Sequence, residues 1–129
     1  MNYKALMIIK CLVCIGFGPI LLFLPEQILT LLGASFCAGA AITAREYGAV
    51  LIGNACLTWL ARGADYSRIR TAIIFYLFIY DGIALVAMLI LQFQGIMNSL
   101  GWGVVAIYLF FTITFGYTYL KQQGIPAKS

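Results

Sequence analysis

Long apolar runs dominate this chain of 129 residues. Four of them hold about 20 residues each, the length a helix needs to cross a hydrocarbon core of about 30 Å at about 1.5 Å per residue. Hydrophobic residues make up 64% of the chain and charged residues 9%, whereas soluble domains average about 45–50% and about 25%. These features exclude a soluble enzyme, a disordered protein and a nucleic-acid-binding domain. They predict an integral membrane protein in a lipid bilayer.

The predicted fold is all-α, an antiparallel bundle of four transmembrane helices in a single domain over residues 1–129. Pro25 and Glu26 suit the first turn of a helix and Gly33 suits its end, which predicts a short interfacial helix at about residues 25–32. The first apolar run follows two lysines as in a signal peptide, but no small-residue cleavage site follows it, so we expect it to be retained. The predicted spans are about residues 5–24, 40–60, 71–93 and 100–120.

The basic residues predict the orientation of the chain. With four spans, seven of the eight lie on one side: Lys4, Lys10, Arg62, Arg68, Arg70, Lys121 and Lys128. The positive-inside rule then predicts that both termini are cytoplasmic, and we expect a bacterial inner membrane. Lys10 lies inside the first run, and we expect its stem to follow lipid while its ammonium reaches the headgroups. If Lys10 prevented this run from inserting, only three spans would remain.

Three ionisable residues fall within the predicted spans: Arg45, Glu46 and Asp81. Charged groups are costly in a bilayer, so they should face protein or water and should pair. At about 1.5 Å per residue, Glu46 lies near the outer interface and Asp81 close to the midplane. We therefore expect Arg45 or Glu46 to meet the neighbourhood of Asp81. An Arg45–Asp81 ion pair fixing the helix register, a local anchor at Arg45, and a ligand, proton or ion site all remain open.

Small and polar residues add further candidates. Ala49, Gly53 and Cys56 follow Glu46 at helical spacing, a stripe that allows close helix packing within the bundle or in a homodimer. Asn54 faces another direction, where it could hydrogen-bond to a neighbouring helix or a second subunit. Aromatic residues of the last two spans form bundle core and lipid-facing surface, or a pocket for a hydrophobic ligand. The polar groups of that pocket would be Tyr80 beside Asp81, and Tyr108 with Thr112.

Little in the sequence predicts catalysis. The absence of histidine removes the common zinc, haem and Ser-His-Asp sites. Cys11 and Cys14 resemble a redox pair, but they lie in the inner half of the first span, and packing of one helix face explains them. We expect no catalytic residue, metal or cofactor, and a membrane enzyme is the least favoured class.

About residues 25–70 share a few features with a known group of membrane proteins. It rests on Pro25 after the first run, on Arg45 with Gly48, and on the closing Trp59 to Arg62. In these features the chain resembles small bacterial four-helix membrane proteins loosely grouped with DoxX-like proteins. The resemblance implies a four-helix membrane fold and no particular activity.

The expected function is non-enzymatic. The chain would be a small accessory or interaction subunit that packs against itself, as a homo-oligomer, or against other membrane subunits. The alternative is a small transporter or lipophilic-ligand-binding protein that uses Arg45, Glu46 and Asp81. A polar cavity that reaches Asp81 would favour transport, and an exposed small-residue seam would favour interaction.

Overall fold

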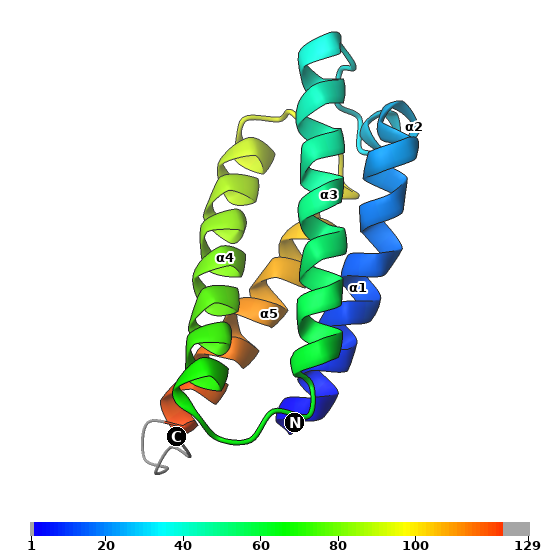
Figure 1. Ribbon diagram of the computed structural model, residues 1–129. Helices are drawn as coiled ribbons and strands as arrows, with labels where there is room; N and C mark the ends of the chain where they lie inside the picture. Colours follow the sequence, from blue (N-terminus) through cyan, green and yellow to red (C-terminus); the bar gives the residue numbers. More distant parts are fainter. Residues whose placement is uncertain (1, 123–129) are drawn as a thin grey trace. The chain divides into compact units, whose positions relative to one another are not determined.

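A computed structural model describes residues 2–122, and over that range the chain forms five α-helices and no strand (Figure 1). The all-α class is therefore confirmed. Lys128, part of the predicted cytoplasmic charge set, lies outside the described residues. The helices are α1 (Tyr3–Phe23), α2 (Pro25–Leu31), α3 (Ala38–Ala61), α4 (Arg68–Phe93) and α5 (Gly101–Gln122).

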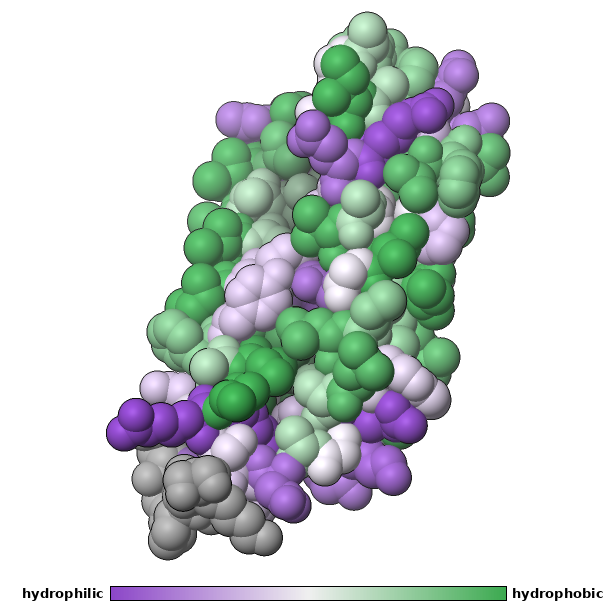
Figure 2. Space-filling model, in the orientation of Figure 1, coloured by the Kyte–Doolittle hydropathy of each residue, from purple (hydrophilic) through white to green (hydrophobic). Residues whose placement is uncertain are grey.

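Within residues 2–122, three helices are long and apolar enough to cross a membrane: α1, α4 and α5. This supports the predicted membrane protein, and the surface visible in Figure 2 is largely apolar. Helix α3 has 24 residues, enough to span, but it falls outside this group because Arg45, Glu46 and Asn54 lower its hydropathy. The four-span bundle, with its antiparallel order and cytoplasmic termini, stays a prediction.

The chain divides into two compact units, residues 1–62 and residues 63–129. In the first unit, α2 contacts both α1 and α3, and α1 and α3 pack along each other. In the second unit, α4 packs along α5. Each unit thus has its own pair of long helices, and the single domain expected from the sequence stays a prediction.

Side chains just before the helices explain where they begin. The Asn2 side-chain oxygen accepts a hydrogen bond from Ala5 N (2.7 Å), and Pro25 occupies the first turn of α2. The Ser67 hydroxyl accepts from Arg70 N (3.2 Å), so α4 begins at Arg68 rather than near residue 71. Arg68 and Arg70, which precede the third predicted span, therefore lie in the first turn of a helix.

Candidate functional site

Two glycines set the contact between α1 and α3. A Cβ built on Gly48 would lie 2.7 Å from both Gly18 O and Leu22 N, so only a glycine leaves room for the α1 backbone. Nearer the other end, Tyr3 Oη donates to Ala61 O at 2.8 Å. The two helices therefore run in opposite directions, in contact from the first turn of α1 almost to its last.

Polar side chains are buried along this helix pair. Lys10 is only 2% exposed and Asn54 4% exposed. Each lies seven residues from the Tyr3–Ala61 contact, about 10 Å along its helix, so they share one level. Thr58, also buried, donates from Oγ1 to Asn54 O at 2.8 Å.

The burial of Lys10 overturns one expectation. The sequence predicts that this side chain follows lipid with its ammonium at the headgroups, whereas the structure encloses it in protein. The position of Lys10 inside an apolar run is the sequence feature that could have indicated its burial. A buried lysine in a spanning helix is a functional candidate by default. Lys10 is therefore a further candidate functional residue, beside Arg45, Glu46 and Asp81.

Arg45 and Glu46 lie on the other side of α3, where both side chains are exposed. Glu46 belongs to an outward surface that runs the length of the helix, because residues spaced alternately by three and four positions share one side. Arg45 borders this surface. We call it the exposed α3 face, and all seven of its members are exposed: Gly39, Ile42, Glu46, Ala49, Gly53, Cys56 and Leu60.

The small residues predicted to pack helices lie at the centre of the exposed α3 face. A Cβ built on Gly53 would meet nothing within 4 Å, and Ala49 and Cys56 are exposed as well. The close contact between α1 and α3 uses Gly48, on the opposite side of α3. The stripe of Ala49, Gly53 and Cys56 therefore remains open in the described chain, with Glu46 above it.

Exposure of a charged pair to lipid would be costly. Insertion scales assign about 2.5–3.5 kcal/mol to an arginine or aspartate at the centre of a spanning helix, and less near the interface. Glu46 lies 16 residues, or about 24 Å, from Arg62 at the far end of α3. In the predicted four-span topology, Arg45 and Glu46 would gain by meeting a partner of complementary charge.

Asp81 is the fully buried ionisable residue of α4, at 0% exposure. Nearby contacts fix the pairing of α4 with α5: a Cβ on Gly82 would lie 3.7 Å from Thr112 Cγ2, and one on Gly116 would lie 2.9 Å from Phe78. Burial agrees with the expectation that Asp81 faces protein. Arg45 belongs to the first unit and Asp81 to the second, and the Arg45–Asp81 ion pair stays a prediction.

The polar groups predicted for an aromatic pocket lie on two helices, Tyr80 on α4 and Tyr108 and Thr112 on α5. Thr112 donates from Oγ1 to Tyr108 O at 2.7 Å, within its own helix, so this hydroxyl is satisfied locally. The rings of Tyr80 and Tyr76 lie 6.0 Å apart on α4. Whether Tyr80 serves a ligand stays a prediction.

Arg70 connects the loop before α4 to the end of α5, a role that its charge alone did not predict. It is 7% exposed, donates from Nη1 to Ala64 O (2.9 Å) and stacks its guanidinium 4.2 Å from the Tyr66 ring centre. With the Gln122 amide oriented so that its oxygen faces Arg70, Nε and Nη2 donate to it at 3.1 and 3.0 Å. One guanidinium thereby holds the loop before α4 and the last residue of α5.

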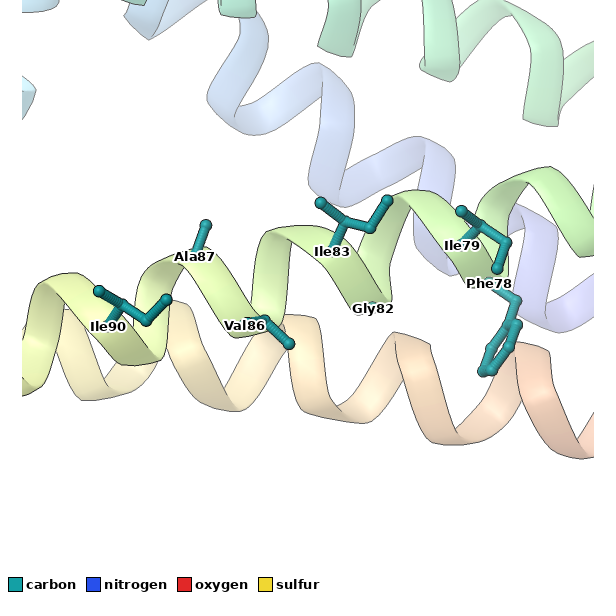
Figure 3. Close-up of a pocket in the computed structure, with 7 residues that line it drawn as sticks. All are labelled: Phe78, Ile79, Gly82, Ile83, Val86, Ala87 and Ile90. Carbon is teal, nitrogen blue, oxygen red and sulfur yellow. The ribbon is translucent and has the colours of Figure 1, made fainter.

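An open apolar groove of about 470 Å³ runs along α4 (Figure 3). Gly82 and Ala87 leave space between larger neighbours, and the exposed walls carry no polar side chain. A groove of this kind suits a hydrocarbon segment. The residues lining it are Phe78, Ile79, Gly82, Ile83, Val86, Ala87 and Ile90.

The cysteines are free thiols in the described chain. Cys14 is buried and Cys11 half-buried on α1, while Cys37 accepts a hydrogen bond from Ala40 N (3.4 Å) at the start of α3. Within residues 2–122, no three His, Cys, Asp or Glu side chains gather as metal ligands.

Compared with protein-family models, curated proteins and solved structures, the chain matches none. The resemblance to DoxX-like proteins therefore stays a prediction.

Proposed function

We propose that this chain is a small four-span protein of a bacterial inner membrane that acts as a non-enzymatic interaction subunit. It binds other copies of itself or other membrane subunits through the exposed α3 face. The observation that carries this proposal is the open small-residue stripe of Ala49, Gly53 and Cys56, with a charged pair beside it. Small residues let a partner helix approach closely, and polar groups add hydrogen bonds in lipid.

Helix packing in the first unit supports the fourth span. α1 is apolar enough to cross a membrane, and α3 runs along it from the Tyr3–Ala61 contact to the Gly48–Leu22 contact. On α3, Gly48 and Ala61 lie 13 positions apart, about 20 Å of helix. A helix held along a spanning helix over that length lies at the same depth. Four spans also gather seven of the eight basic residues on one side, which supports cytoplasmic termini.

Site-specific photo-crosslinking in native membranes tests the interaction role. A benzophenone side chain replaces Ile42 or Leu60, which are 62% and 81% exposed at the two ends of the exposed α3 face. The matched control replaces Leu12, 62% exposed on α1. We expect discrete protein adducts from Ile42 and Leu60, and mainly lipid adducts from Leu12. Lipid adducts alone from all three positions would overturn the proposal.

Buried charge favours a second candidate, a small transporter or lipophilic-ligand-binding protein. Asp81 is fully buried in α4, and intramembrane ionisable residues commonly serve transport or ligand binding. The α4 groove adds an apolar surface for a hydrocarbon segment.

The Asp81→Asn variant tests this candidate by native mass spectrometry in mild detergent. If Asp81 holds a ligand, the variant loses a lipophilic molecule that the parent protein retains, while the thermal unfolding midpoint stays the same. Equal ligand occupancy in both proteins would count against the candidate, and a lowered midpoint with no bound molecule in either would assign Asp81 a structural role.

A further inference from the structure

Two opposite charges lie side by side on α3, Glu46 on the exposed α3 face and Arg45 at its border. Arg45 immediately precedes Glu46, and both side chains are exposed about two turns into α3. Written as a heptad, Glu46, Gly53 and Leu60 occupy one inner position and Ile42, Ala49 and Cys56 the other. Arg45 then occupies the flanking position next to Glu46.

Copies of one chain insert into a membrane with the same orientation, because the same basic residues direct each of them. A symmetric dimer in the membrane therefore has its two-fold axis along the bilayer normal, and equal residues meet at equal depth. In such a pair, the Glu46 side chain enters a gap on the partner helix. Two residues that border this gap are the second copy's own Glu46 and the Arg45 that precedes it. Each Glu46 thus meets the partner's Glu46 and the partner's Arg45, and the two arginines offset the repulsion between the two carboxylates.

We propose that the occupant of the exposed α3 face is a second copy of this chain, paired in parallel through α3 and joined by two reciprocal Arg45–Glu46 ion pairs. This inference rests on the proposed interaction role and names the partner. The face is self-complementary in charge, so a second copy supplies both counter-charges at the required depth. Another protein would need its own acidic and basic side chains, placed at that same level to meet Arg45 and Glu46.

The centre of the face fits the same arrangement. Ala49, Gly53 and Cys56 lie one to three turns from Glu46, and nothing lies within 4 Å of a Cβ built on Gly53. Two such small-residue stretches allow the backbones to approach closely. Ile42 and Leu60 then pack at the ends of the contact, and Cys56 faces its equivalent in the second copy.

Charge exchange tests the ion pairs. Arg45→Glu places acidic side chains at both positions, and Glu46→Arg places basic side chains at both. We expect either variant alone to associate about tenfold less, equivalent to about 1.4 kcal/mol. The double variant Arg45→Glu/Glu46→Arg keeps the composition and the net charge, and we expect it to regain self-association.

A mixture gives the sharper measurement. Two differently tagged chains, one Arg45→Glu and the other Glu46→Arg, should form mixed dimers in preference to dimers of either kind. Dimers are scored in membranes by oxidation to a disulfide, with Cys56 retained and Cys11, Cys14 and Cys37 replaced by alanine. The control chain has Cys56→Ala as well and carries Leu12→Cys on α1, where we expect no crosslink.

The outcomes separate the inference from the role on which it rests. Cys56 crosslinks that follow the charge exchange support the ion-paired dimer. Cys56 crosslinks indifferent to both charge reversals overturn the ion pairs, and a crosslinked partner other than this chain overturns the dimer, but both leave the interaction role. A monomer without protein adducts at Ile42 or Leu60 overturns both. If a single variant fails to accumulate, the double variant still decides, because loss of its Cys56 crosslink would overturn the ion-paired dimer.

Discussion

The contact between Gly48 and α1 offers a direct test of the packing in the first unit. Gly48→Ala adds one methyl group at a point where 2.7 Å separates its position from each of two backbone atoms, Gly18 O and Leu22 N. Ordinary van der Waals contacts begin near 3.4 Å, so the gap is short by about 0.7 Å. Both atoms belong to the backbone of α1 and cannot turn aside as a flexible side chain would.

The helices must therefore separate or tilt. Overpacking of this kind costs about 1–3 kcal/mol. Alanine has the better helix propensity by about 1 kcal/mol, which offsets part of that cost. We expect Gly48→Ala to lower the free energy of unfolding by about 1–2 kcal/mol, since the clash involves two backbone atoms.

Two further glycines of α1 complete the series. A Cβ on Gly18 would lie 2.9 Å from Ile52 Cγ1, the side chain of which can shift, and 3.2 Å from Gly48 O. A Cβ on Gly16 would meet nothing within 4 Å. The expected order of destabilisation is Gly48→Ala, then Gly18→Ala, with Gly16→Ala neutral or stabilising.

The assay is reversible unfolding by SDS in mixed micelles, followed by far-UV circular dichroism and, with Trp102 replaced by phenylalanine in every variant, by the fluorescence of Trp59 on α3. Equal stability of Gly48→Ala and Gly16→Ala would refute the proposed close approach of α1 and α3. Loss of stability in both would point to a helix effect unrelated to the contact.

Three other predictions follow from the described contacts and the proposed topology. Arg70→Lys should lose the two-pronged contact with Gln122 and the ring stacking, lowering stability by about 1–2 kcal/mol, whereas exposed Arg68→Lys should change nothing measurable in the same SDS titration. Tyr3→Phe should lose the hydrogen bond to Ala61 and lower stability by about 1 kcal/mol, without moving the α1–α3 crosslinks of introduced cysteine pairs. A reporter fused at the C-terminus should be active only in the cytoplasm, and activity outside it would reject the four-span topology.

Most helix positions could be predicted from the sequence, because long apolar runs and end signals act locally. Pro25 marks the first turn of α2, and its predicted extent is close to the observed one. The start of α4 was misplaced by about three residues, because Ser67 was not recognised as a cap. A serine before a stretch of basic and aromatic residues indicates the start of a helix less clearly than a proline does.

The site was harder to predict, because periodicity does not say which face of a mixed helix packs inward. α3 carries small residues on two sides, Gly48 on one and Ala49 with Gly53 on the other. The stripe pattern predicts helix packing through the second group, whereas the backbone contact uses Gly48. Lys10 was misread for a related reason, because a lysine in an apolar run can snorkel or be buried.

The division of the chain at Arg62 has a consequence for biosynthesis. The described contacts between α1 and α3, from Tyr3–Ala61 to Gly48–Leu22, form within the first 62 residues. The remaining 67 residues, 129 less 62, take about 3 to 13 seconds to synthesise at bacterial-to-eukaryotic elongation rates of about 5–20 residues per second. During that interval the glycine contact can stabilise the α1–α3 hairpin as a folding intermediate, while the ribosome is still translating α4 and α5.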